Sequence, residues 1–191
     1  MRRTLLTLML TLLALSTPAR AVLVTVSITS GGSPVVNAAP SSSIPVEITI
    51  TSDEPIVSWQ LDVLGDAGFS HPGILDTDYN NVLWDQAFSI EEAAGNLPIG
   101  NIGSLNLAGV SGTNLAVSFS MTVPAINGAY PITINIDDIG DESFQSVPPE
   151  NITLVPLTVI VPEPATLTMA LLSLPLLYPR RLIRSAMNTK R

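Results

Sequence analysis

The feature that most limits how this chain can fold is a period-two alternation of apolar and polar residues. It recurs in five segments, at residues 22–29, 44–51, 56–63, 115–123 and 130–136. Successive side chains of an extended strand point to opposite faces, so each segment is predicted to be a strand with one buried and one solvated face. Such strands are typical of antiparallel sheets. Within residues 22–161, residues 85–94 are the one helical candidate.

Turn-forming residues separate these strands and limit their length. Gly, Pro and Ser crowd residues 31–34 and 39–43, and an Asn-Gly pair stands at 127–128. A sixth apolar segment, 152–161, contains Pro156, which cannot donate a ladder hydrogen bond and therefore indicates a bulge or a sheet edge. Short strands with frequent turns predict an all-β fold, an antiparallel β-sandwich of the jelly-roll type.

The two tryptophans bear on carbohydrate binding, because a flat sugar-binding surface needs exposed aromatic rings. Trp59 falls on the apolar face of its predicted strand, so we expect it in the core. Trp84 stands near Tyr79 and Phe88, either as a lone exposed contact or as a residue that fixes its loop to the core. The second arrangement is the commoner, and the polar faces of the strands carry no aromatic row.

The charged residues are distributed unevenly along the chain. All eight basic residues lie near its ends: Arg2, Arg3, Arg20, Arg180, Arg181, Arg184, Lys190 and Arg191. Residues 22–161 hold fifteen of the sixteen acidic residues and no Lys or Arg, which gives this stretch a formal charge of −15 with histidine neutral. Such a stretch repels itself at low salt and repels nucleic acid, so binding to DNA or RNA is excluded as a function.

Residues 22–161 offer little for catalysis. Their length of 140 residues suits one domain with one apolar core, and the chain has no cysteine. The single histidine, His71, is predicted to be an exposed loop residue, and no G-x-S-x-G elbow accompanies it. Carboxylate pairs of the glycosidase kind lie in turn-rich segments. We therefore predict no enzyme activity, and a secreted glycan-active enzyme is the least favoured alternative.

Two acidic clusters are candidate Ca²⁺ sites, because calcium prefers carboxylate and carbonyl oxygens. In the first cluster, Asp76, Asp78 and Asn80 have the 1, 3, 5 spacing of a calcium loop. An EF-hand is excluded, since Asn81 and Ala87 stand where that motif needs Gly and Glu.

The second cluster consists of Asp137, Asp138 and Asp141, which we expect in a loop after a strand. Calcium bound at either cluster would offset part of the self-repulsion of the acidic stretch. The alternative is that these Asp and Asn residues serve only as turn formers. No other cofactor is predicted.

The N-terminal segment, residues 1–21, has the form of a secretory signal peptide. Arg2 and Arg3 form its basic start, and an apolar stretch follows at residues 5–15. Ala19 and Ala21 provide the small-x-small cleavage site for signal peptidase. We therefore expect export and a mature chain that begins at Val22.

The C-terminal segment also has the composition of a membrane-directed signal. The motif Pro162, Glu163 and Pro164 precedes fourteen predominantly apolar residues, 165–178. Because about 20 residues are needed to cross a bilayer core, a buried core helix is an alternative. The basic block that follows favours a hydrophobic helix in the membrane, since Lys and Arg beside an apolar segment stay on the cytoplasmic side. Residues 185–191 would then be a cytoplasmic tail.

The motif, the apolar stretch and the arginine cluster at 162–184 together resemble the PEP-CTERM sorting signal of bacterial exosortase substrates. The resemblance implies that a membrane exosortase recognises the Pro-Glu-Pro residues and cuts near them, with the apolar stretch as membrane stop. The implied retention signal is the arginine cluster, Arg180, Arg181 and Arg184. The implied location is the cell envelope or surface of a bacterium that makes exopolysaccharide. The chain would be membrane-anchored before processing, and anchored or released afterwards.

The order of the predicted strands resembles that of the cohesin-like domain, a jelly-roll sandwich of about this size. The matching segments are 46–50, 57–63, 114–119 and 127–132, followed by a closing strand that ends at Val161. The sequence departs from cohesins just after the second of these segments, where Leu-Gly-Asp-Ala-Gly replaces their usual Tyr-Asp-Pro turn. The resemblance therefore does not imply dockerin binding.

The leading prediction is an exported, exosortase-sorted surface or extracellular-matrix protein with a non-catalytic β-sandwich. The alternative is a cohesin-like module that binds a protein or a carbohydrate. Its partner would then be another surface protein or the exopolysaccharide.

Overall fold

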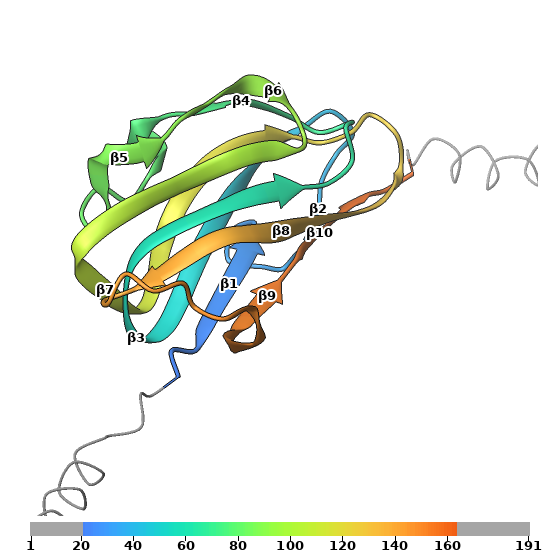
Figure 1. The fold of residues 1–191 in the computed structure, drawn as a ribbon. Coiled ribbons are helices and arrows are strands. Elements are labelled where there is room, and N and C mark those ends of the chain that lie inside the picture. Colours follow the sequence, from blue (N-terminus) through green and yellow to red (C-terminus); the bar gives the residue numbers. More distant parts are fainter. Residues whose placement is uncertain (1–20, 164–191) are drawn as a thin grey trace, which may run out of the picture.

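The computed structural model describes residues 21–163, which form strands and two short 3₁₀ helices (Figure 1). The strands are β1 (Val24–Thr29), β2 (Val35–Asn37), β3 (Ser43–Leu64), β4 (Ser70–Ile74), β5 (Asp85–Ile90), β6 (Glu92–Asn96), β7 (Ile99–Thr122), β8 (Gly128–Asp141), β9 (Ile152–Val155) and β10 (Leu157–Val161). The 3₁₀ helices are η1 (Asp76–Asp78) and η2 (Pro149–Asn151). The predicted all-β fold is confirmed, since this part of the chain contains no α-helix.

Two layers of strands pack face to face, and the long strands β3 and β7 belong to both (Figure 1). Residues 43–52 of β3 pair with 112–122 of β7, and 47–52 also pair with β1. Residues 56–64 pair with β8, and 56–63 pair with 99–110 of β7. β9 extends the first layer beside β1, and β10 and β2 extend the second beside β8. The sheet is mixed rather than purely antiparallel, because β1–β9 and β10–β2 are parallel pairs.

A corner in β3 and β7 carries both strands from one layer to the other. Pro55, which lacks an N–H, lies in the break of register between Ser52 and Ile56. On β7, Gly109 and Gly112 have φ angles of 76° and 81°, a conformation that other residues rarely adopt. A Cβ on Gly109 would lie 2.8 Å from the Cβ of Pro55. The corner therefore requires glycine at this position.

The apolar faces of both layers meet in one core. Alternate residues of β1 and of the first half of β3 are buried, as their period-two sequence requires. The ring of Trp59 packs 5.8 Å from Tyr79 and 6.0 Å from Trp84, measured between ring centroids. Trp59 and Trp84 are 2% and 1% exposed. These values confirm that Trp59 belongs to the core and that Trp84 fixes its loop to it.

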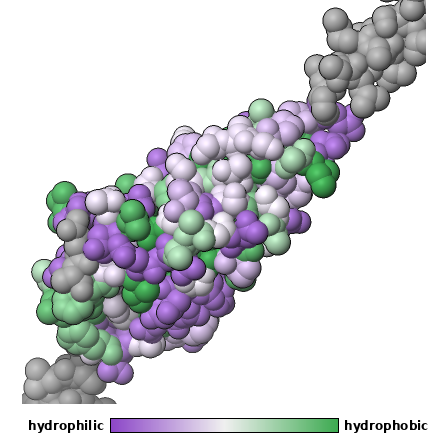
Figure 2. All heavy atoms as spheres, turned by 90° about the horizontal axis from the view of Figure 1, so that it is seen from above, coloured by the Kyte–Doolittle hydropathy of each residue, from purple (hydrophilic) through white to green (hydrophobic). Residues whose placement is uncertain are grey.

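The surface of the sandwich is mainly polar. Hydrophilic residues cover most of the face seen from above, and apolar residues gather toward its lower left end (Figure 2). The buried polar side chains in the described part are three serines and His71, so none of its carboxylates is buried. The negative charge of residues 22–161 is therefore carried at the surface.

The alternating segments form strands where they were predicted, although three of these strands, β3, β7 and β8, extend further. Residues 44–51 and 56–63 join in the single strand β3, and 115–122 form the last part of β7, with Val123 just beyond its end. The apolar segment 152–161 is divided by Pro156 into β9 and β10. β9 lies at the edge of its layer, while β10 is paired on both sides.

Three local predictions are wrong. Residues 85–94 form β5 and the start of β6 instead of a helix, because pairing with β7 and β4 outweighs the helix propensity of their Ala and Glu. Asp137, Asp138 and Asp141 lie at the end of β8 rather than in a loop. His71 lies in β4 and is 6% exposed, because its imidazole packs beside Gly95 of β6, where an added Cβ would lie 3.7 Å from Nε2.

The described chain enters and leaves the sandwich at opposite ends (Figure 1). Val24 pairs with Ser52 beside the corner. Val161 pairs with Gly128, at the end of β8 that lies away from the corner. Any membrane attachment that follows β10 would therefore leave the corner end of the domain pointing away from it.

The described part of the chain contains no helix that is long and apolar enough to cross a membrane. Residues 1–20 and 164–191 lie outside the described residues. The signal peptide, the hydrophobic C-terminal helix and the sorting signal therefore stay predictions from sequence.

Candidate binding groove

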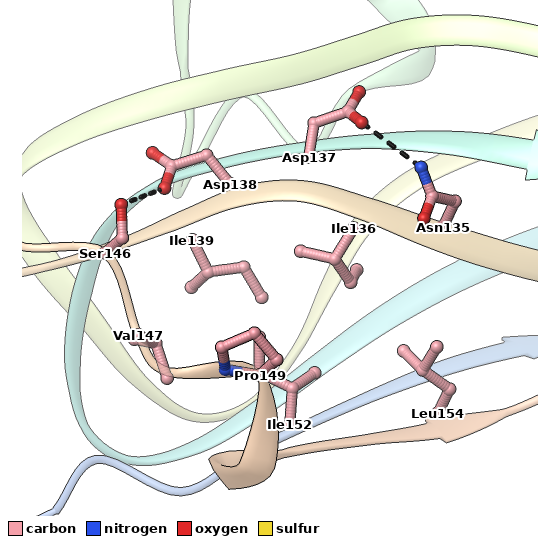
Figure 3. A pocket seen from close by; sticks show the side chains of 10 residues that line it. All are labelled: Asn135, Ile136, Asp137, Asp138, Ile139, Ser146, Val147, Pro149, Ile152 and Leu154. Atoms are coloured by element: carbon pink, nitrogen blue, oxygen red, sulfur yellow. Dashed lines mark hydrogen bonds between the residues drawn. The ribbon is translucent and has the colours of Figure 1, made fainter.

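A groove of about 310 Å³ opens between β8 and β9 (Figure 3). Six apolar side chains point into it: Ile136, Ile139, Val147, Pro149, Ile152 and Leu154. The polar residues that line it are Asn135, Asp137, Asp138 and Ser146. In Figure 3 the two carboxylates stand on the opposite side of β8 from the two isoleucines of that strand. The groove thus has an apolar floor and, along β8, an acidic rim.

The groove exists because β8 and β9 diverge. β10 pairs with β8 only as far as the Leu157–Ile132 pair. Pro156 then ends the strand, and β9 pairs with β1 in the other layer. Within the described chain, residues 133–138 of β8 consequently pair only with β3, and β9 pairs only with β1. One edge of each strand is left without a strand partner.

Residues 142–148 close one end of the groove. The N–H of Asp141 donates to the carbonyl oxygen of Gln145 at 2.9 Å, and the N–H of Val147 donates to that of Ile139 at 2.7 Å. The carboxylate of Asp141 also accepts two backbone N–H bonds from this loop, at 2.8 and 3.0 Å. These bonds hold Val147 against β8, so the closed end is preformed.

A bulge in β8 places two consecutive carboxylates at the rim. Ile136 is opposite Leu61 and Asp138 is opposite Gln60, so Asp137 has no counterpart on β3. Without this additional residue, alternation would turn one of the two aspartates toward the groove floor.

The rim carboxylates accept hydrogen bonds but face no Lys or Arg, because the described chain contains neither. Asp138 accepts from the hydroxyl of Ser146 at 2.6 Å, and Asp137 accepts from the amide of Asn135 at 3.2 Å (Figure 3). The same amide lies 3.5 Å from a carboxylate oxygen of Asp62. Desolvation raises the pKa of Asp137, and the like charge of Asp62 raises it further. A cation at this rim would relieve that repulsion.

The first predicted calcium cluster lies at η1 and just after it. A carboxylate oxygen of Asp78 accepts from the N–H of Leu75 at 2.8 Å. The side-chain amide of Asn80 donates to the carbonyl oxygen of Leu115 at 3.1 Å. Asp76 is the first residue of the helix. The hydrogen bonds of Asp78 and Asn80 fix this turn and tie it to β7.

The residues of the second predicted cluster have two different structural roles. Asp137 and Asp138 belong to the groove rim, whereas Asp141 holds the loop that follows β8. Among residues 21–163, no three His, Cys, Asp or Glu side chains converge as metal ligands would. Calcium binding stays a prediction, which thermal unfolding in millimolar Ca²⁺ or Mg²⁺ at equal ionic strength tests. A gain in stability specific to Ca²⁺ supports it, and equal gains reject it.

A second hollow, of about 300 Å³, lies around Trp84. Its exposed apolar residues, Val82 and Leu107, are 89% and 66% exposed. Trp84 itself is buried and packs in the core beneath its loop, so its ring offers no flat exposed face to a sugar.

Part of the predicted sorting motif is visible at the end of the domain. Pro162 and Glu163 follow β10 directly and are exposed, while Val161 before them is buried. Ala21, from the predicted cleavage site, is exposed at the other end. The remaining predicted signal residues lie outside the described residues: Ala19, Pro164, Arg180, Arg181 and Arg184.

Sequence reasoning missed the groove itself. One signal was present, because residues 152–155 carry apolar side chains on both faces and such a segment cannot bury them all at a sheet edge. The paired aspartates at 137–138, which interrupt the alternation of β8, were a second signal.

No protein-family model matches the sequence, and no curated protein is significantly similar to it. Solved structures do share the fold. CaCohA2 from Clostridium acetobutylicum, solved in complex with CaDoc0917, matches with a TM-score of 0.58 at 18% identity, over 73% of this chain and 99% of that chain. The seventh ScaB type I cohesin from Pseudobacteroides cellulosolvens matches with 0.55 at 11% identity, over 75% and 94%. A non-cellulosomal cohesin from the archaeon Archaeoglobus fulgidus matches with 0.51 at 20% identity, over 74% and 92%.

These matches cover most of the described residues. They establish that the chain has the β-sandwich fold of cohesins, as the order of its strands predicts.

Proposed function

We propose that this chain is an exported, non-catalytic β-sandwich that binds another protein at the cell surface or in the extracellular matrix. In this proposal residues 1–21 are a signal peptide and 22–161 are the binding domain. Residues 162–184 are an exosortase sorting signal, and 185–191 are a cytoplasmic tail.

The observation that carries the proposal is the cohesin-like fold. A type I cohesin of similar fold from Clostridium thermocellum is solved in a cohesin–dockerin complex, with a TM-score of 0.51 to this chain. The groove between β8 and β9 adds an apolar surface that the domain does not fill itself. Apolar side chains around a concave surface are what binding sites generally require.

The position of the predicted sorting motif supports delivery to the cell surface. Glu163 is exposed directly after the last paired residue of the domain, Val161. A membrane protease could therefore reach the motif without unfolding the sandwich. The groove lies further along β8, roughly 30 Å from this end if each of the nine steps from Gly128 to Asp137 advances the strand by about 3.3 Å.

Carbohydrate binding is the weaker alternative. Both tryptophans are buried in the core, so neither offers the flat exposed ring on which sugars stack. The polar faces of the alternating strands carry Ser, Thr, Asn and acidic residues.

Affinity capture with the full chain, purified in detergent, tests the proposal. The chain is immobilised in folded form, with a heat-unfolded sample as matched control, and is exposed to extracellular matrix from the producing bacterium. We expect saturable retention of one protein by the folded chain alone. Retention of polysaccharide without protein would favour the carbohydrate alternative, and equal retention by both samples would reject specific binding.

The sorting part of the proposal has a separate test, the Glu163→Ala substitution in the producing bacterium. We expect accumulation of the unprocessed chain in the membrane fraction, detected by its larger mass. Unchanged processing and unchanged location would show that the Pro-Glu-Pro motif is not the recognition element.

A further inference from the structure

We infer that the groove between β8 and β9 binds an extended peptide segment of the partner, with apolar side chains in the groove and a Lys or Arg at the Asp137–Asp138 rim. The inference rests on the proposed protein-binding function, and it assigns to that function a surface and a partner chemistry.

The size and lining of the groove suit side chains of a peptide. Its volume of about 310 Å³ lies at the small end of the range for ligand sites. Leu154 is 43% exposed, and Ile136 and Ile152 are half-buried, so apolar surface remains to be covered. The preformed end beside Val147 means that little ordering is needed on binding.

The strand edges that flank the groove favour an extended occupant. Residues 133–138 of β8 and all of β9 have one edge without a strand partner in the described chain. An extended peptide can add to such an edge through backbone hydrogen bonds while alternate side chains enter the adjoining groove. A compact small molecule would fill the groove but leave these backbone groups to water.

The negative charge of the rim favours a positively charged partner. Asp137 and Asp138 face no basic side chain of this domain, and Asp62 adds a third carboxylate close to Asp137. A Lys or Arg that follows the apolar residues of the peptide would supply the missing cation. Complementary charge at such a rim raises the association rate and excludes acidic competitors.

The same charge argues against a second copy of this domain as the occupant. Residues 22–161 contain no Lys or Arg, so a second copy would bring only carboxylates to the rim. The arginine cluster of this chain's own C-terminus is predicted to lie on the other side of a membrane, and β10 leads toward it from the opposite end of the sandwich. A separate basic protein is therefore the occupant that the charges favour.

Selection from a phage library of short random peptides, on the full chain in detergent, tests the inference. We expect the selected peptides to carry apolar residues at alternate positions and an adjacent Lys or Arg. Replacing that basic residue by Glu in a synthetic copy should weaken binding at least about tenfold, measured by fluorescence anisotropy.

Variants of the chain locate the binding surface. Leu154→Gln, at a partly exposed position, should weaken binding of the synthetic peptide about tenfold or more. Leu115→Gln is the matched control, because Leu115 is 38% exposed but lies on β7, on the other side of β3 from β1 and β9. Asp137→Asn combined with Asp138→Asn should weaken binding about three- to tenfold, with a smaller effect in high salt. Glu47→Gln is the corresponding control for the loss of a carboxylate.

The outcomes separate this inference from the proposed function. Three outcomes would each overturn the inference. The library yields no binding peptide, the selected peptides carry no basic residue, or the peptide binds the Leu154→Gln and Leu115→Gln chains with equal affinity. If the Leu154→Gln chain still captures the matrix partner at full affinity, the groove is not the binding surface, but the proposed protein binding is retained. If the unaltered chain captures no partner, the proposed function fails as well.

Discussion

The first half of β3 and the β8–β9 flank use the same kinds of side chain in opposite ways. Residues 47–52 of β3 lie between β1 and β7, and their inward side chains are buried by the facing layer, with Ile48 fully inaccessible. β8 and β9 diverge, and Leu154 on β9 remains 43% exposed. Apolar residues therefore stabilise the fold in the first region and remain available to a partner in the second.

Two local features produce this difference. Pro156 ends β9 where β10 begins and lets the chain pass from one layer to the other. The bulge at Asp137 then keeps both rim carboxylates off the groove floor. No strand break or bulge occurs in β1 or in residues 43–48 of β3. Alternation continues there, and the pairing of β3 with β7 keeps one register through Pro45.

The sharpest way to break this comparison is to shorten one apolar side chain in each region. Ile48→Ala should lower the free energy of unfolding by about 2–5 kcal/mol, because it leaves a cavity in a fully packed core. Leu154→Ala should cost less than about 1 kcal/mol, because that side chain is already partly in water. Urea unfolding of the full chain, followed by tryptophan fluorescence, measures both. Equal losses would mean that the β8–β9 flank is as closely packed as the core.

The corner that joins the two layers offers a second test. A positive φ costs an L-residue about 1–2 kcal/mol. Gly109→Ala should lower the free energy of unfolding by more than this, because its Cβ would also press on Pro55. Gly112→Ala has the same backbone cost, but its Cβ would have no atom within 4 Å. The difference between the two variants in thermal unfolding isolates the contact with Pro55. No difference would show that the corner opens to relieve the contact.

The smallest expected effect concerns the rim. The pKa of Asp137 is higher in the folded chain than its ordinary value of 3.8. Its protonated carboxyl therefore adds to the free energy of unfolding below pH 3.8, and this contribution is lost as the pH rises through the folded pKa. Asp137→Asn should therefore raise the stability at pH 7 by a few tenths of a kcal/mol, and by almost nothing at pH 3. Thermal unfolding at the two pH values measures the gain.

The control for this rim prediction is the same substitution in an Asp62→Asn background, where the gain at pH 7 should shrink because the like charge is gone. A gain that persists unchanged in that background, or that grows toward pH 3, would contradict the assigned repulsion.

The regular part of the fold could be predicted from sequence because its information is local. The alternation at Val24, Val26 and Ile28 specifies a strand and its buried face without reference to any partner. The same holds for Trp59, whose register in its strand already places it in the core.

The rest depends on contacts between residues far apart in the sequence. Residues 85–94 contain good helix formers, and only their pairing with β4 and β7 makes them strands. His71 stands between Ser70 and Pro72 as a loop residue would, and its burial follows from the position of β6. The groove likewise arises from where β9 leaves β10, which no local pattern specifies.

The direction of β10 has a mechanical consequence if the chain is tethered beyond Glu163. β10 is hydrogen-bonded on one side to β2 and on the other to β8, and it runs straight toward the exit of the chain. The hydrogen bonds between paired strands lie roughly perpendicular to the strands. A force between the tether and a partner held at the groove would act along β10, so it would load all the hydrogen bonds of both strand pairs at once, in shear. Such a domain would resist traction at its anchor far better than one whose last strand could be peeled away bond by bond.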